Sequence, residues 1–214
     1  MDIRVLFLFF MIYSFLGWIM ETLICSYMDG KIVNRGFFIG PYLPIFGIGA
    51  VVITLLLSSY SNDIFVLFIM SSVLGAALEY IASYLLEKIF HTRWWNWYHH
   101  KFNLNGRTCL FAAIGFGILG VMMIMFFNPF IFSIINGLSV FYLNLISLVL
   151  ALVFITDMII SFKIISGITS EDFGKAKDTT EEVSKKVREI LKEKSILSKR
   201  LFNAFPDLKI KYKK

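Results

Sequence analysis

Two glutamates in strongly apolar surroundings are the residues of this chain best placed to do chemistry. They occur in the matching contexts Gly17-x-x-x-Glu21 and Gly75-x-x-x-Glu79, and a leucine precedes each glycine. A carboxylate at membrane depth is costly, so it generally faces protein or a water-filled cavity and marks an ion, proton or substrate site. Each glycine lies one helical turn before the acid on the same face, which lets a neighbouring helix approach closely. We therefore expect both acids to face protein rather than lipid.

Side chains that could satisfy these acids lie in the two loops that follow them. The candidates are Arg35 and Arg107, with Asn34, Asn103 and Asn105 as further donors. Two interpretations are open. In the first, each half of the chain has an intramembrane Glu-Arg pair that only holds two helices together. In the second, these groups line a polar cavity open to the cytoplasm and bind an ion, a proton or a polar head group.

A third acid, Asp157, is expected at a similar depth. Because a helix rises about 1.5 Å per residue, Glu21 and Glu79 should lie roughly 8 to 10 Å inside the cytoplasmic ends of their helices. Asp157 stands six residues before Lys163, near the end of the last apolar segment. We predict that the three carboxylates share one layer of the inner leaflet, although Asp157 is close enough to the interface to reach it alone.

The elements that position these residues must be membrane-spanning helices. Apolar residues make up 57% of the chain and aromatic residues 17%, with 23 phenylalanines. A soluble domain of 214 residues cannot bury that much apolar surface. We therefore predict an all-α polytopic membrane helical bundle, in which lipid surrounds the apolar faces.

Five segments are long and apolar enough to be predicted as spans, since crossing the hydrocarbon core takes roughly 20 residues. They are, in chain order, residues 5–27, 44–60, 64–86, 108–127 and 141–162. The second and fourth contain more glycine and no charged residue. The apolar stretch 129–140 is left open as a surface helix, a half-helix or the start of a sixth crossing.

The distribution of basic residues predicts the orientation, because Lys and Arg are retained on the cytoplasmic side. Lys31 and Arg35 follow the first span, four basic residues lie between the third and fourth spans, and Lys163 follows the fifth. The opposite side offers only Arg4. With five spans, we expect a multi-pass protein of the bacterial cell membrane, with its N-terminus outside and its C-terminus in the cytoplasm.

The two halves of the membrane region indicate a diverged internal duplication. At an offset of 58 residues the two Gly-x-x-x-Glu motifs align, and each returning segment carries a Gly-x-Gly, at 47–49 and at 115–117. Because each copy holds two spans, the copies keep one membrane orientation, as parallel repeats about an axis along the membrane normal. The predicted membrane domain is 1–165, with repeats at about 5–60 and 64–127 and the fifth span at about 141–162.

The tail, residues 166–214, differs sharply in composition. It holds 13 Lys or Arg and 8 Asp or Glu, so it supplies +5 of the formal charge of +6. Its apolar residues recur at helical spacing and predict a cytoplasmic amphipathic helix. They are Val183, Val187, Ile190, Leu191, Leu197, Leu201 and Phe205. This helix could lie on anionic lipid or dock on a cytoplasmic partner; nucleic acid is excluded because the charges alternate in sign and no recognition motif is present.

The aromatic run after the third span has a simpler interpretation. Trp94, Trp95 and Trp97 are predicted to be interfacial, because indole rings prefer the depth of the lipid head groups. The adjacent His99 and His100 point in different directions, and no Cys or Asp completes a ligand set. We therefore predict no metal site and no cofactor.

These motifs resemble those of a family of bacterial membrane proteins, the ABC-transporter type IV family, also called CmpB-like. The resemblance covers about residues 8–125. It is carried by Phe15-Leu16-Gly17-Trp18-x-x-Glu21, Val33-Asn34-Arg35-Gly36-Phe37, Gly40-Pro41, Pro44-Ile45-Phe46-Gly47, Glu79-Tyr80, Glu87-Lys88, Trp94-Trp95 and Phe102-Asn103-Leu104-Asn105-Gly106-Arg107. The chain departs from the family pattern at Asn96-Trp97, where Asp-Tyr is more usual, and this weakens any catalytic role for the tryptophan loop.

The resemblance implies a permease-like membrane subunit of an ABC-type transporter. The chain has no Gly-x-x-x-x-Gly-Lys-Ser/Thr loop, so nucleotide hydrolysis would require a separate cytoplasmic ATPase subunit. One alternative is a membrane enzyme acting on a lipid or isoprenoid head group, with Glu21 or Glu79 as acid or base and Arg35 or Arg107 holding an anionic group. Another is a small scaffold or regulator. The bilayer is the one partner required; a homo-oligomer, the substrate and the protonation of the acids are left open.

Overall fold

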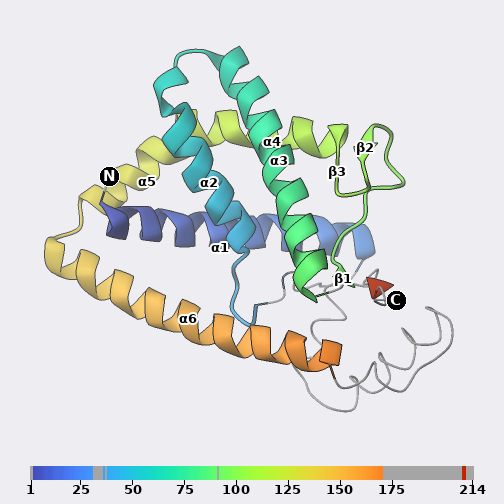
Figure 1. The fold of residues 1–214 in the computed structure, drawn as a ribbon. Helices are drawn as coiled ribbons and strands as arrows, with labels where there is room; N and C mark the ends of the chain where they lie inside the picture. The colour runs from blue at the N-terminus through green and yellow to red at the C-terminus, as the bar shows by residue number, and fades with distance from the viewer. Residues whose placement is uncertain (1, 31–35, 37, 91, 171–208, 211–214) are drawn as a thin grey trace, which may run out of the picture.

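The computed structural model describes residues 2–30, 36, 38–90, 92–170 and 209–210 (Figure 1). Its helices are α1 (Ile3–Asp29), α2 (Pro44–Leu57), η1 (Ser58–Tyr60), α3 (Ile64–Phe90), α4 (Leu110–Met122), η2 (Met123–Phe127), α5 (Asn128–Asn136) and α6 (Val140–Ser170). Its strands are β1 (Thr92–Arg93), β2 (Asn103–Leu104), β3 (Thr108–Cys109) and β4 (Lys209–Ile210). The fold is thus mostly helical, as predicted.

Four helices are long and apolar enough to cross a membrane. They run over Ile3–Tyr27, Ile64–Ile89, Leu110–Asn136 and Val140–Lys163. The remaining predicted span forms the shorter apolar helix Pro44–Tyr60. Within the described residues, each of the five predicted spans therefore overlaps an apolar helix, and four of these helices have the length of a full crossing.

The end predicted for the fourth span was wrong. We expected it to end near residue 127, before Pro129, but α4, η2 and α5 form one apolar helix that continues to Asn136. Proline normally disrupts a helix because its ring clashes with the carbonyl four residues earlier, which here is that of Met125. Met125 lies in the π-helical turn η2, whose wider turn gives the ring room. The apolar stretch after Pro129 is therefore largely the end of the fourth long helix.

Helices pack in two pairs, α1 with α2 and α3 with α4, and glycines permit the close approach in both. A Cβ atom added at Gly17 would lie 2.3 Å from Cγ of Phe46, and one added at Gly75 would lie 2.4 Å from Cβ of Phe116. Real side chains do not approach so closely, so only glycine fits at either position. The glycine of each Gly-x-x-x-Glu motif thus receives a phenylalanine from the returning helix.

A second pair of contacts joins the same helices. Ser14 and Ser72 each donate their hydroxyl to the carbonyl four residues earlier, at 2.7 and 2.8 Å. Each hydroxyl also lies beside a glycine of the returning helix: a Cβ atom at Gly47 or at Gly117 would lie 2.2 Å from the corresponding Oγ. The two helix pairs therefore make equivalent glycine contacts at equivalent positions.

A buried polar network joins α1, α2 and α5. The hydroxyl of Tyr13 in α1 donates to Oδ1 of Asn128 at 2.7 Å, and Nδ2 of Asn128 donates to Oγ1 of Thr54 in α2 at 2.9 Å. Asn128 follows the π-helical turn directly. The network joins three helices inside an apolar core to which α1, α2, α3, α5 and α6 all contribute.

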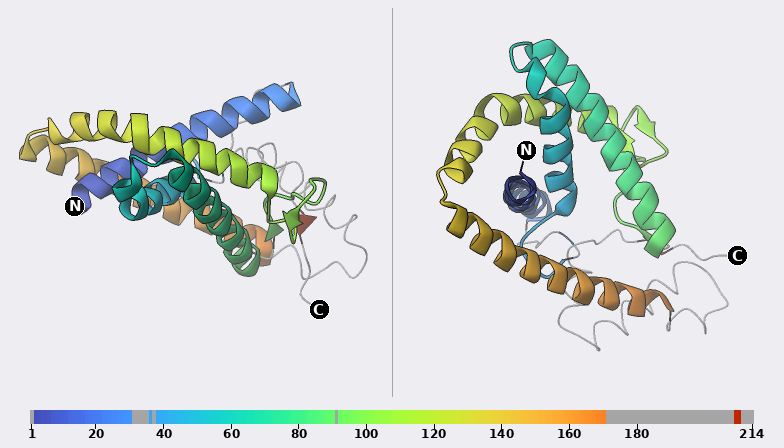
Figure 2. Two further views of the ribbon diagram at one scale, coloured as in Figure 1. Left: turned by 90° about the horizontal axis from the view of Figure 1, so that it is seen from above. Right: turned by 60° about the vertical axis from the view of Figure 1, so that its left-hand side comes forward.

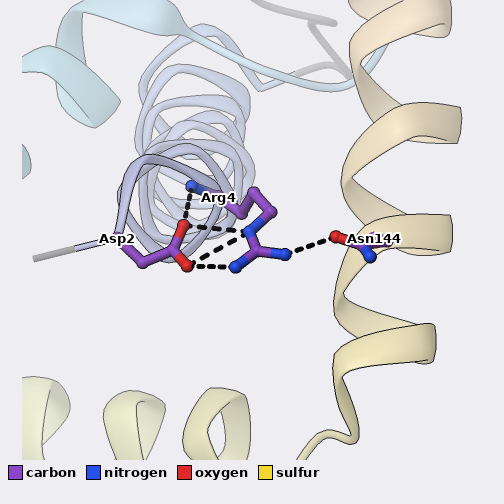
Figure 3. A network of polar contacts seen from close by, with 3 residues as sticks. All are labelled: Asp2, Arg4 and Asn144. Carbon is purple, nitrogen blue, oxygen red and sulfur yellow. Dashed lines mark hydrogen bonds and ion pairs between the residues drawn. The ribbon is translucent and has the colours of Figure 1, made fainter.

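Helix α6 lies at the edge of the bundle and is held at both ends by polar contacts. Near its start, Oδ1 of Asn144 accepts a hydrogen bond of 2.5 Å from Arg4, whose guanidinium also pairs with Asp2 (Figure 3). Near its other end, Asp157 binds the loop that precedes α2. Most apolar side chains of α6 are exposed, which fits a helix that faces lipid.

The ends of α1, α3 and α6 lie on one side of the molecule, together with the loop that carries β1, β2 and β3 (Figures 1 and 2). The N-terminus and α5 lie on the other side. Strand β4 pairs antiparallel with β1, so Lys209–Ile210 also lies beside this loop. The amphipathic helix predicted in the tail falls outside the described residues.

Candidate functional site

Glu79 and Asp157 are the two most deeply buried acids among the described residues of the long helices. Only 9% of Glu79 is exposed, on the face of α3 that the loop 94–109 covers. Its Oε1 accepts one hydrogen bond, of 3.1 Å, from the indole Nε1 of Trp97. The hydroxyl of Thr108 faces the carboxyl group. Neither Oε2 of Glu79 nor Oγ1 of Thr108 has a hydrogen-bond partner of standard geometry among the described residues.

The loop over Glu79 is a folded unit. Strands β2 and β3 form a hairpin whose turn contains Asn105 and Gly106, at φ 51° and 66°. Asn and Gly tolerate these positive φ values, which is why an Asn-Gly pair closes the turn. The amide of Trp97 donates to the carbonyl of Gly106 at 2.9 Å. The hairpin therefore fixes the indole that contacts Glu79.

Further contacts fasten this loop to α3. Nδ2 of Asn105 donates to the hydroxyl of Tyr80 at 3.0 Å. Nε1 of Trp95 donates to the carbonyl of Arg107 at 2.9 Å. Both Asn105 and Arg107 were predicted as site residues, and the structure brings both onto the face of α3 that holds Glu79.

Arg107 does not form the ion pair with Glu79 that one of the two interpretations expected. Its guanidinium forms an ion pair of 2.9 Å with Glu87 instead of Glu79, and both side chains are almost buried. It also donates to Oγ of Ser83 at 3.2 Å, and it lies over the rings of Tyr80 and Tyr84, 5.7 and 5.4 Å from their centroids. Glu87 is eight residues, roughly 12 Å, further along the helix, closer to where the loop returns.

Sequence reasoning did not assign Glu87 a place in the site, although a signal was present. Tyr80, Ser83, Tyr84 and Glu87 follow the spacing of one helical face. Polar and aromatic residues on a single face at the end of an apolar helix indicate a surface that protein covers.

Glu21, the equivalent acid in α1, is half-buried. It is near enough to Glu79 for the two carboxyl groups to repel each other. The structure therefore brings these two predicted site residues together. Arg35 and Asn34 lie outside the described residues, so their contacts with Glu21 stay a prediction.

Asp157 has its own set of partners, on the loop before α2. It accepts hydrogen bonds from the amides of Ile39 and Gly40, at 3.0 and 2.6 Å. The hydroxyls of Tyr42 and Ser161 also donate to it, the latter at 2.6 Å. Four donors satisfy a charged carboxylate well. Asp157 therefore stabilises the position of α6 against this loop.

The tryptophans differ in burial. Trp94 is buried, whereas Trp95 and Trp97 are partly exposed and direct their indole N–H groups into the protein. Their predicted interfacial position stays a prediction. His100 is exposed and packs edge-on against Trp97, with 5.0 Å between the ring centroids. Within the part of the chain that the structure describes, no three His, Cys, Asp or Glu residues are grouped to hold a metal ion.

Comparison with known proteins supports the resemblance found in the sequence. The sequence profile of the family described as "Putative ABC-transporter type IV" matches residues 8–162. This range includes Glu21, Glu79, the loop 94–109 and Asp157. No curated protein and no solved structure gives a significant match.

Proposed function

Because the chain belongs to the family described as "Putative ABC-transporter type IV", we propose that it is a permease-like membrane subunit of an ABC-type transporter. The observation that carries this proposal is Glu79, an acid buried in a long apolar helix and covered by a folded loop. An incompletely satisfied acid at such a position is typical of ion and substrate pathways. We propose that a separate cytoplasmic subunit supplies the ATPase, because the sequence has no phosphate-binding loop.

The proposed topology has five crossings. The ends of α1 and α3 lie on one side of the molecule, so the chain must return between them, and α2 with η1 is the helix available for that return. At about 1.5 Å per residue this helix extends roughly 25 Å, somewhat less than the hydrocarbon core. The basic loops then share the cytoplasmic side with the tail, and the N-terminus lies outside.

The two helix pairs are proposed to be copies of one duplicated unit. The contacts of Gly17 and Gly75 with a phenylalanine support this, and so do the serines that face Gly47 and Gly117. The contacts occur in the same order in both pairs, which chance similarity of apolar helices does not explain. Parallel repeats of this kind place a binding site at their interface, where Glu21 and Glu79 approach each other.

The loop 94–109 is the surface proposed to contact the ATPase. It exposes Tyr98, Phe102 and Leu104, and Phe102 is 79% exposed. Apolar side chains presented on a rigid loop outside the bundle are typical of an interaction site. Lys101 lies among them and is also exposed.

The enzyme alternative receives less support. That interpretation required Arg35 or Arg107 to hold an anionic group, and Glu87 already neutralises the guanidinium of Arg107. A head-group enzyme would therefore depend on Arg35, which lies outside the described residues.

Affinity purification of the full-length protein from its native membrane tests the proposal. We expect a nucleotide-hydrolysing subunit to co-purify, and F102A with L104A to reduce its recovery several-fold. F65A is the matched control, because Phe65 is equally exposed at the start of α3, far from the loop. Absence of any ATPase from the purified complex, or equal losses with F65A, would contradict the proposal.

A further inference from the structure

Two buried acids in the long helices are satisfied very differently. Asp157 accepts four hydrogen bonds, which is what a charged carboxylate requires in a water-poor environment. Glu79 is equally buried and, among the described residues, accepts one hydrogen bond, from Trp97. The comparison within one protein indicates that Asp157 is held as an anion, whereas the surroundings of Glu79 are not built for a charge.

Two buried oxygens, one of Glu79 and one of Thr108, lack hydrogen-bond partners among the described residues. Oε2 of Glu79 and Oγ1 of Thr108 are both buried, Thr108 being 6% exposed, and neither has a standard hydrogen bond within the described ranges. A hydrogen must lie between two oxygens that face each other, and either the hydroxyl of Thr108 or a protonated Glu79 can supply it. If Thr108 donated, a carboxylate at Glu79 would still have only two donors, half the number that Asp157 has. A protonated carboxyl group supplies an O–H donor that the carboxylate lacks, while Oε1 continues to accept from Trp97.

We propose that Oε2 of Glu79 is a proton-binding site, with Thr108 as the acceptor of the acid's hydrogen bond. A hard metal cation would need about six oxygen ligands, whereas a proton needs one acceptor. This proposal deepens the permease-like function and rests on it in one respect only: the proton would be the ion that the subunit exchanges during transport. Proton binding itself is independent of that function.

The charged and titratable groups around Glu79 agree with a neutral acid. Glu21 approaches from α1 and repels a second negative charge. Arg107 is engaged by Glu87, so its charge is compensated further along α3. From the loop, His100 contacts the ring of Trp97 and not the carboxyl group. Among the described residues, Glu79 forms no ion pair.

Infrared difference spectroscopy of the full-length protein in nanodiscs, titrated with pH, tests the proposal directly. A protonated carboxylic acid has a C=O stretching band that is separate from the carboxylate and amide bands. We expect one such band at neutral pH, its loss in E79Q, and its retention in D63N. Asp63 is an exposed cap of α3 and serves as the matched control. T108V should shift the frequency of the band, because the O–H group loses its acceptor.

Three results would overturn the proposal. The first is a band that persists in E79Q, and the second is a band that disappears in D63N. The third is an E79Q protein that does not fold. Glutamine is neutral and similar in size to the protonated acid, so a site built for a neutral side chain should accept it. The titration requires no ATPase, so failure to find a nucleotide-hydrolysing partner would refute the transporter function while leaving the proton site intact.

Discussion

Replacing Gly75 by alanine should destabilise the protein, although alanine is the better helix former. A Cβ atom at this position would lie 2.4 Å from Cβ and 2.6 Å from Cγ of Phe116. Optimal carbon contacts are about 3.5 to 4.0 Å, so the two helices would have to separate by roughly 1 Å. Overpacking of this kind costs about 1 to 3 kcal/mol, whereas the gain in helix propensity is about 1 kcal/mol at most. We therefore expect a net loss of about 1 kcal/mol in the free energy of unfolding.

Gly115, in the facing helix, provides the matched control. No heavy atom lies within 4 Å of a Cβ atom added there, so G115A keeps the propensity gain without the clash. Reversible unfolding in bicelles or mixed micelles measures both variants. Truncating the partner in G75A/F116A should not restore stability, because alanine retains the Cβ atom that clashes. Equal stabilities of G75A and G115A would refute the contact and, with it, the close packing of α3 on α4.

Three further predictions address the polar contacts. E87Q should lower the free energy of unfolding by about 3 kcal/mol, because it leaves the nearly buried charge of Arg107 without its counter-ion; E87Q/R107Q should cost less than the two single losses added together. Y13F should cost about 1 to 3 kcal/mol, because Oδ1 of Asn128 loses its donor; a thermal shift assay measures the loss, and stability equal to wild type would contradict the network. Arg4 lowers the pKa of the Asp2 carboxyl group from 3.8 to about 2, so the stabilisation that this ion pair gives to the start of α1 is complete above pH 3.8 and is lost as the pH falls towards 2. Hydrogen exchange in the first turn of α1 should therefore accelerate over that range and stay constant above it.

The family resemblance was already visible in the sequence, and the profile match to residues 8–162 confirms it. The motifs that carried it combine glycine, proline, tryptophan and charged residues at fixed spacing, which apolar helices rarely acquire by chance. The position of the helices could also be predicted, because runs of apolar residues long enough to cross a bilayer need no tertiary information. The end of the fourth helix could not be, since a π-helical turn overrides the usual effect of Pro129.

The candidate site was predicted in part. The sequence indicated that Glu21 and Glu79 lie at one depth, but only the structure shows that they are near enough for their carboxyl groups to repel each other. A pair between Glu79 and Arg107, which one of the two interpretations expected, does not form. The depth of an acid along α3 does not determine where the returning loop meets the helix. Glu87 lies where the hairpin of β2 and β3 delivers the guanidinium.

The sequence by itself determined which residues must enter the bilayer and which rare polar groups must be compensated there. Both follow from the cost of placing charge or unpaired polar atoms in an apolar medium, and this cost depends on residue type alone. Only the tertiary structure decided how each acid is compensated. Among the residues that the structure describes, Asp157 receives four donors from a distant loop and α6, whereas Glu79 receives one, from Trp97. Such numbers depend on contacts between segments far apart in the chain.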